Sequence, residues 1–124
     1  MKAFIRLLMS VLFVTAPLPS PSLAQTPVVV TDTEAAEYIG HDVTVEGVVT
    51  AVSTSRKGNT FINCGGAYPN QTFTGWVPAG NPLARDPWIT SLKGKTIKIQ
   101  GVIELYKGKP EIRILSRDQI ITEG

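Results

Sequence analysis

The sequence has little of the chemistry that builds metal centres, disulfide frameworks or nucleophilic active sites. Among 124 residues there is one cysteine, Cys64, and one histidine, His41. A single cysteine excludes an intramolecular disulfide, and the pair cannot supply a spaced Cys/His zinc set. Cys64-Gly65-Gly66 is not followed by the Lys-Ser/Thr pair of a phosphate-binding loop. We therefore predict a protein that is not an enzyme, with no metal and no cofactor.

The sequence also lacks a strong net charge. Its formal charge is +2, from twelve basic and ten acidic residues. Two of the basic residues, Lys2 and Arg6, lie in the first 24 residues, which hold no acidic residue, so ten of each remain beyond them. Residues 25–124 are therefore neutral overall, which excludes a uniformly basic nucleic-acid coat and a polycationic membrane binder. A segment of this length has room for one domain.

The first 24 residues have the pattern of a secretory signal peptide. Lys2 and Arg6 form a positive start, residues 7–16 form an apolar stretch, and Ser22-Leu23-Ala24 places small residues where cleavage needs them. The apolar stretch is short for a membrane helix, and no second one follows. We predict a cleavable signal peptide over 1–24, one domain over 25–124, a periplasmic or secreted protein, and no membrane association after cleavage.

The rest of the chain alternates short strands with turns. Hydrophobic alternation predicts long strands near residues 43–52 and 95–106. The same pattern with turn residues at the ends predicts shorter strands and two short helical segments. The shorter strands are expected at 28–30, 60–64, 72–77 and 111–115, and the helical segments at 34–39 and 88–92.

The two long strands repeat one pattern. The segment 40–49 aligns with the segment 94–103 at a constant offset, and each carries a glycine at the same place, Gly47 and Gly101. A glycine inside a strand lets it coil sharply around a small barrel. Five main strands with a helical element between the third and fourth then predict a small closed Greek-key barrel.

Several motifs resemble the tRNA-anticodon-type OB-fold domains of nucleic-acid-binding proteins, including small exported bacterial versions. The resemblance covers about residues 37–120 and rests on Val43-Thr44-Val45-Glu46-Gly47-Val48-Val49, Thr60-Phe61-Ile62-Asn63, Tyr68-Pro69-Asn70-Gln71-Thr72-Phe73-Thr74 and Gly101-Val102-Ile103-Glu104-Leu105-Tyr106-Lys107-Gly108-Lys109-Pro110-Glu111-Ile112. It implies an all-β, five-stranded Greek-key OB-fold barrel, with short helices before the first barrel strand and between the third and fourth. Because this fold hosts many functions, the ligand must be argued from the site.

The resemblance implies binding across the outer face of the strands at 60–64 and 72–77, between two flanking loops. Both loops are basic: one holds Arg56 and Lys57, the other Lys107 and Lys109. Residues 85–117 hold eight basic and three acidic side chains, whereas residues 32–46 hold five acidic side chains and no Lys or Arg. These four cations are the predicted phosphate contacts, because long cationic side chains at loop tips suit phosphate. The alternative is that both pairs are only solvated turn residues.

Aromatic side chains would add base stacking. Alternation directs Trp76 outward, and Tyr106 lies beside a basic turn, so these two are the predicted stacking residues. Trp76 packing beneath the proline-rich loop that follows it remains an alternative. Phe61 is expected in the core. Cys64 is expected to be a small buried hydrophobe, with a reactive or dimer-forming thiol as the alternative.

The leading hypothesis is an exported, non-catalytic OB-fold protein that binds single-stranded DNA or RNA, or another anionic polymer. One alternative is a periplasmic protein that binds a small or cationic ligand, in which Asp42 and Glu46 would matter more. Another is a protein–protein module that pairs through a barrel edge or loop face.

Overall fold

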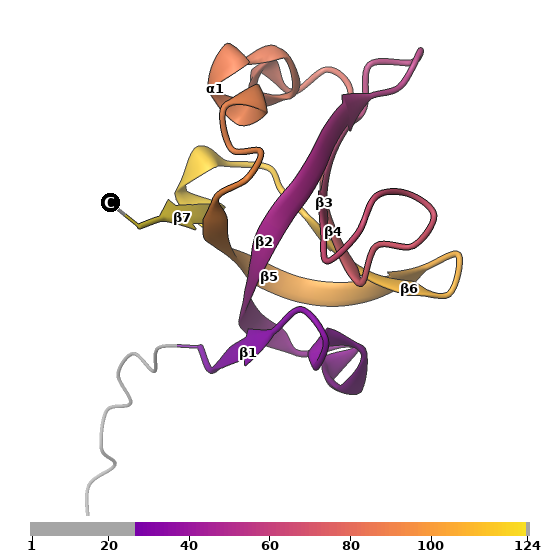
Figure 1. Cartoon of the computed structure of the whole chain (residues 1–124), viewed down its shortest axis with the longest axis vertical. Helices are drawn as coiled ribbons and strands as arrows, with labels where there is room; N and C mark the ends of the chain where they lie inside the picture. Colours follow the sequence, from indigo (N-terminus) through magenta and orange to yellow (C-terminus); the bar gives the residue numbers. More distant parts are fainter. Residues whose placement is uncertain (1–26, 124) are drawn as a thin grey trace, which may run out of the picture.

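The computed structural model describes residues 27–123, and the predicted signal peptide at 1–24 lies outside them. The fold is mostly β, as predicted (Figure 1). In chain order its elements are β1 Val29–Thr31, the 3-10 helix η1 Ala35–Tyr38, β2 Asp42–Thr54, β3 Thr60–Cys64, β4 Phe73–Val77, the 3-10 helix η2 Pro82–Arg85, α1 Pro87–Thr90, β5 Thr96–Tyr106, β6 Lys109–Arg113, the 3-10 helix η3 Arg117–Gln119 and β7 Ile120–Thr122.

All seven strands belong to one sheet that closes on itself. The order is β1-β2-β3-β4-β6-β5-β7, and β2 also pairs with β5. The pairings join β2, β3, β4, β6 and β5 into a barrel-like ring, with β1 and β7 added to β2 and β5. Most neighbours are antiparallel, whereas β1 with β2 and β4 with β6 are parallel. Closing the ring leaves only the three-residue strands β1 and β7 without a second neighbour, which limits exposed sheet edge.

Each long strand changes partner just after its glycine. In β2 the pairing with β5 ends at Val48, one residue past Gly47, and the pairing with β3 begins at Val49 across a register shift. In β5 the pairing with β2 ends at Val102, one residue past Gly101, and the pairing with β6 begins at Ile103. The repeated glycines thus mark the two places where a strand bends from one part of the sheet to the other.

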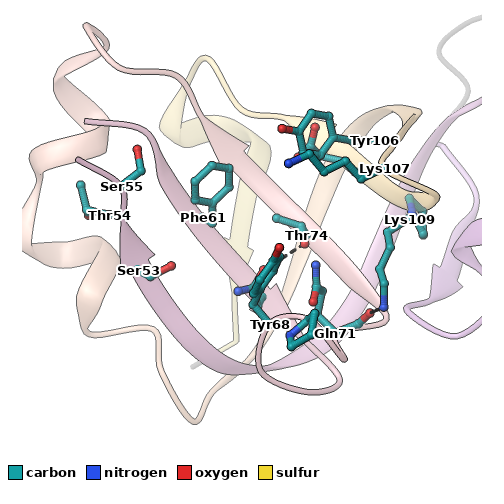
Figure 2. Close-up of a pocket in the computed structure, with 14 residues that line it drawn as sticks. Ser53, Thr54, Ser55, Phe61, Tyr68, Gln71, Thr74, Tyr106, Lys107 and Lys109 are labelled. Atoms are coloured by element: carbon teal, nitrogen blue, oxygen red, sulfur yellow. Dashed lines mark hydrogen bonds between the residues drawn. The ribbon is translucent and has the colours of Figure 1, made fainter. Parts of the chain in front are cut away.

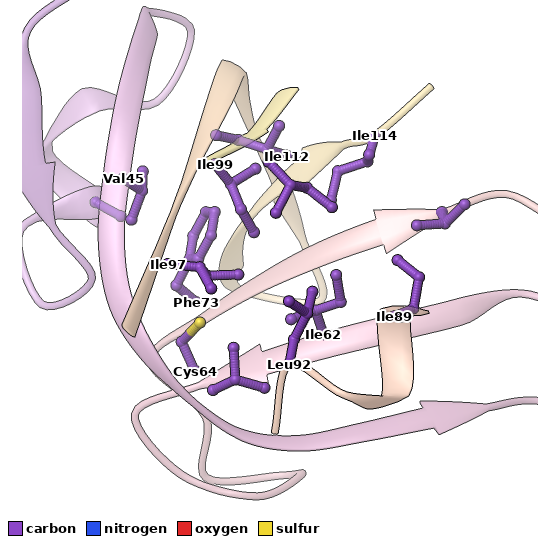
Figure 3. Close-up of a cluster of buried hydrophobic side chains, with 14 of the residues drawn as sticks. Val45, Ile62, Cys64, Phe73, Ile89, Leu92, Ile97, Ile99, Ile112 and Ile114 are labelled. Atoms are coloured by element: carbon purple, nitrogen blue, oxygen red, sulfur yellow. The ribbon is translucent and has the colours of Figure 1, made fainter. Parts of the chain in front are cut away.

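The hydrophobic core fills the inside of the ring (Figure 3). Alternate residues of the strands point inward, and α1 adds Ile89 and the following turn adds Leu92 at one end of the ring (Figure 1). The Thr60 hydroxyl donates to the Ala84 carbonyl at 2.7 Å, which ties η2 to β3. The largest fully buried side chains are those of Val45, Val49, Ile62, Phe73, Val77, Ile89, Leu92, Ile97, Ile99, Ile103, Ile112 and Ile114.

Three details differ from the expectation drawn from the pattern. The sheet has seven strands, because the short β7 follows η3 and pairs with β5. The last ring strand is Lys109–Arg113 rather than 111–115, since its pairing begins directly after the two-residue turn. The helical segment before β2 is a 3-10 helix. Within residues 27–123, no helix is long and apolar enough to cross a membrane.

The glycine bends make a stability prediction. A Cβ at Gly101 would lie 2.6 Å from Ile112 Cγ2, whereas a Cβ at Gly47 would lie 3.2 Å from the Cβ atoms of Asp32 and Cys64. Gly101→Ala should therefore lower the free energy of unfolding by about 1–3 kcal/mol, and Gly47→Ala by less. Urea denaturation followed by fluorescence measures both. Equal stability of Gly101→Ala and the wild type would contradict this packing.

Candidate binding site on the outer face of the ring

The floor of the candidate site is a row of polar side chains on the outer face of β3, β4 and β6. The register places Asn63 opposite Thr74 and Thr74 opposite Glu111. All three side chains are buried, and the Thr74 hydroxyl donates to Asn63 Oδ1 at 2.9 Å. An antiparallel sheet commonly leaves polar side chains of its outer face in water. The burial of this row shows that another part of the chain covers it.

The covering element is the connection between β3 and β4, residues 65–72. Near its start, the Gly66 N–H donates to Thr50 Oγ1 at 3.1 Å, and the Thr50 hydroxyl lies 2.7 Å from the Gly66 carbonyl. At its end, the Thr72 hydroxyl donates to the carboxylate of Asp32, in the segment after β1. The loop is thus anchored at both ends, and it shields the polar row beneath it.

A cavity of about 440 Å³ opens between the floor, this loop and the turn that joins β5 to β6 (Figure 2). That volume lies within the range of small-molecule sites in proteins. The turn itself consists of Lys107 and Gly108, which both have positive φ and so make a tight two-residue hairpin. The side chains around the cavity belong to Ser53, Thr54, Ser55, Phe61, Asn63, Tyr68, Pro69, Gln71, Thr74, Tyr106, Lys107, Lys109, Pro110 and Glu111.

The rim of the cavity combines aromatic rings with cations. Tyr68 is 71% exposed and Tyr106 is 52% exposed, and Figure 2 shows both rings beside the opening, with Phe61 on the strand between the loops. Lys107 Nζ lies 5.3 Å from the centre of the Tyr106 ring. Lys109 Nζ donates to the main-chain carbonyl of Gln71 at 3.0 Å. Flat rings and nearby positive charge are the two features that hold a nucleic-acid strand.

Glu111 gives the floor an unusual carboxyl group. The pKa of Glu111 is raised to about 7, chiefly by burial and further by the negative charge of Glu104, its cross-strand neighbour, while Arg113 opposes the shift. A carboxyl with such a pKa is both protonated and ionised near neutral pH. The cavity floor can therefore exchange a proton under ordinary conditions.

Gln71 is the second notable polar residue of the cavity lining. Gln71 is 8% exposed, and its side-chain oxygen is buried without a hydrogen-bond partner among the described residues. A buried acceptor without a partner destabilises the fold by roughly 1–3 kcal/mol. A bound molecule that donates to this oxygen would remove that cost, so Gln71 marks the inner wall as a place for a polar ligand group.

The structure brings together some of the predicted contact residues and separates others. Tyr106, Lys107 and Lys109 all line the cavity. Arg56 and Lys57 are exposed in the loop between β2 and β3, and neither belongs to the lining. That loop still contributes to the cavity wall through the end of β2 and the residue after it.

Trp76 lies on the outer face of β4, but outside the cavity lining. It is half-buried, and its indole N–H donates to Asn59 Oδ1 at 3.1 Å. Asn59 Oδ1 also accepts from the N–H of Ala79, just after β4. The guanidinium carbon of Arg113 lies 5.1 Å from the indole ring centre. The ring is therefore fixed by a loop and partly covered by an arginine.

Eleven of the fourteen lining residues were not among the predicted contacts, and the four that matter most for binding are Phe61, Tyr68, Gln71 and Glu111. The expectation that Phe61 is a core residue is wrong, because Ile62 and Cys64 point inward and Phe61 points to the other face. Strand alternation alone was enough to predict that Phe61 points outward. The other three depend on how residues 65–72 fold back, which strand alternation does not describe.

The remaining chemical candidates have ordinary structural roles or lie apart from the cavity. Cys64 is buried in the core, as expected, and burial raises the pKa of its thiol to about 12. Such a thiol is a poor nucleophile. Asp42 and Glu46 lie on β2 opposite β5, outside the cavity lining. Within residues 27–123, no cluster of three His, Cys, Asp or Glu side chains could hold a metal ion.

The comparisons with known proteins bear on the fold. No protein-family model and no curated protein matches this sequence. A chain named as an aspartyl-tRNA synthetase from Leishmania major Friedlin matches with a TM-score of 0.52 and 11% identity, over 86% of this chain and 22% of that one. An aspartyl tRNA synthetase from Entamoeba histolytica matches with a TM-score of 0.47 and 16% identity, over 86% of this chain and 28% of that one. The chain thus spans about a fifth of the Leishmania protein and shares its fold with that part.

The raised pKa of Glu111 makes a prediction about stability. In the unfolded chain the carboxyl has an ordinary pKa near 4.5, so it loses its proton there before it does in the folded protein. The folded state should then lose stability as the pH rises from about 4.5 to about 7, by on the order of 3 kcal/mol in all. Glu111→Gln should remove this loss.

Urea denaturation of both proteins at pH 4 and pH 8 measures the effect. The variant should gain stability over the wild type at pH 8 relative to their difference at pH 4. A difference that does not change with pH would show that Glu111 titrates as an exposed glutamate does.

Proposed function

We propose that this chain is an OB-fold domain that binds single-stranded nucleic acid, or another extended anionic polymer, without catalysing a reaction. The ligand lies across the outer face of β3, β4 and β6, with one of its units in the cavity. The observation that carries the proposal is the meeting of Phe61, Tyr68 and Tyr106 with Lys107 and Lys109 around one cavity.

The fold comparison supports nucleic-acid binding as the class of function. The match with the Leishmania chain covers most of this protein, and the name of that chain identifies tRNA as its substrate. The tRNA-anticodon-type OB-fold motifs include the loop that covers the polar row and the strands that flank it. Synthetase activity does not follow, because this chain matches only 22% of that protein.

Each part of the rim has a role in such binding. Lys107 and Lys109 bind phosphate, which supplies affinity without sequence preference. Tyr106 and Tyr68 are exposed enough for bases to stack on them, and Phe61 offers a third ring deeper in the cavity. Arg56 and Lys57, at the far end of β2, extend the cationic track for a longer strand.

Residues 1–24 direct export in this proposal, so the mature domain works in the periplasm or outside the cell. The supporting pattern is the positive start, the apolar stretch and the small residues before Gln25. Cleavage before Gln25 can be read directly by mass spectrometry of the protein purified from a bacterial periplasmic extract.

A second candidate function is the binding of a small cationic ligand. The observation that favours it is the buried carboxyl of Glu111, with Glu104 beside it on the neighbouring strand. A cation in the cavity would balance both charges. This candidate predicts weak oligonucleotide binding that salt hardly changes, whereas the leading proposal predicts the opposite.

Phosphate binding by the turn gives a direct prediction. An oligothymidylate should bind at low salt, and its affinity should fall steeply between 50 and 200 mM salt, because the counterions that binding releases gain less entropy in more concentrated salt. Lys107→Glu should weaken binding several-fold and reduce the slope of log affinity against log salt. Lys107 suits this test because its side chain makes no hydrogen bond to the rest of the described chain, unlike Lys109.

Lys93→Glu is the matched control, because Lys93 is an exposed lysine outside the cavity lining. It changes the net charge equally and should weaken binding much less. Equal effects of the two variants would assign the affinity to net charge rather than to this site.

Stacking gives a separate prediction. Tyr106→Ala should weaken oligothymidylate binding by about 1–3 kcal/mol, or roughly five- to a hundredfold, because one base loses its ring partner. Tyr106→Phe keeps the ring and should bind nearly as the wild type does. Fluorescence anisotropy titrations measure all three proteins, and unchanged affinity in Tyr106→Ala would exclude stacking at this position.

A further inference from the structure

We propose that the cavity binds its anionic ligand together with one proton, carried by Glu111, so that affinity falls as the pH rises above neutrality. This inference rests on the proposed function and adds a regulatory property to the same site. It stands on the position of one carboxyl group and on the charges that surround it.

The carboxyl of Glu111 occupies the floor of the cavity and is only slightly accessible. The residue is 6% exposed, and it belongs to the lining. Among residues 27–123, the one ion pair within 4.0 Å joins Lys98 and Glu123, so no cation is paired with Glu111. A carboxylate in this position is partly desolvated and uncompensated, which favours its protonated form.

The groups around Glu111 do not remove this imbalance. On β3 and β4 its neighbours Asn63 and Thr74 are uncharged. The charged and titratable groups that line the cavity with Glu111 are Tyr68, Tyr106, Lys107 and Lys109, and Glu104 and Arg113 lie beside it on β5 and β6. Farther along the elements packed around it are Cys64 on β3, Lys98 on β5, and Glu37 and Tyr38 on η1, which contacts β6.

The nearby cations are engaged elsewhere. Lys109 Nζ is hydrogen-bonded to the Gln71 carbonyl, Lys107 lies over the Tyr106 ring, and Arg113 lies over Trp76. Glu104 is the nearest cross-strand charge, and it has the same sign as Glu111. The rim of the cavity is cationic, whereas its floor carries the single carboxyl of Glu111, with Glu104 beside it on β5.

A bound anionic polymer makes the ionised form of Glu111 still less favourable. Phosphates bound by Lys107 and Lys109 bring negative charge close to Glu111, and a base that covers the cavity removes its remaining water. In the protonated state the same group becomes an O–H donor, which can serve a carbonyl oxygen of a base or a phosphate oxygen. Glu111 therefore takes up a proton when the ligand binds. The pKa near 7 of the free protein agrees with this, since the proton is then available in a normal pH range.

The test is a set of oligothymidylate titrations between pH 6 and pH 8.5 at constant ionic strength. The probe is an oligothymidylate without terminal phosphates that carries a rhodamine-type dye, so that neither end nor dye titrates in this range. For the wild type, the dissociation constant should rise by at least about tenfold from pH 6 to pH 8.5. The upper limit is tenfold per pH unit, since one proton is bound.

Three variants assign the effect. Glu111→Gln cannot titrate, so its affinity should change less than about twofold over the range. Glu104→Gln removes the like charge while it keeps Glu111, so the fall in affinity should begin at a lower pH. His41→Gln is the control for a histidine, whose charge ordinarily changes in this range. It should keep the wild-type profile, because His41 lies outside the cavity lining.

Each outcome decides the proposal. A wild-type affinity that is independent of pH overturns the proton uptake and leaves the proposed function standing. An affinity that rises with pH overturns it too, because Glu111 would then accept from the ligand as a carboxylate. A pH dependence that survives in Glu111→Gln assigns the proton to another group. No binding at pH 6 and low salt overturns the proposed function together with this inference.

Discussion

The architecture depends on two long strands that must each pair with two partners. β2 and β5 hold each other over their first halves and then diverge, β2 toward β3 and β5 toward β6. The divergence closes the ring, and it occurs directly after Gly47 and Gly101, where a neighbouring side chain occupies the space of a Cβ. The core, the outer face of the ring and the loop that folds over this face all follow from that closure.

The candidate site is a product of the loop as much as of the ring. Residues 65–72 are held by Thr50 at one end and by Asp32 at the other, so they shelter a polar row that would otherwise meet water. Burial and the charge of Glu104 raise the pKa of Glu111, and Gln71 in this loop has a buried side-chain oxygen without a hydrogen-bond partner among the described residues. Tyr68, Tyr106 and Lys107 at the rim remain exposed. A buried floor with one titratable carboxyl and a more exposed cationic rim therefore surround one cavity.

Most of the ring could be predicted, because its information is local. Alternation located the long strands and the inward residues, and the offset between Gly47 and Gly101 indicated where the sheet bends. The same pattern also predicted Tyr106, Lys107 and Lys109 as part of the site, since the turn at Lys107 must lie at a loop tip. Glu111 and Gln71 could not be found this way, because their burial depends on contacts with residues far away in sequence. Alternation correctly placed Trp76 on the outer face, but it could not show the hydrogen bond to Asn59 or the cover of Arg113.

The proposal on which the function depends is that an anionic polymer occupies the cavity between residues 65–72 and the β5–β6 turn. The most direct measurement is a two-dimensional amide NMR titration of the mature domain with an oligothymidylate at low salt. We expect the largest shifts on residues 65–72, on the turn at 106–109 and on the middle of β3 and β4. Shifts confined to the β1–β2–β5–β7 part of the sheet, or none at all, would contradict it.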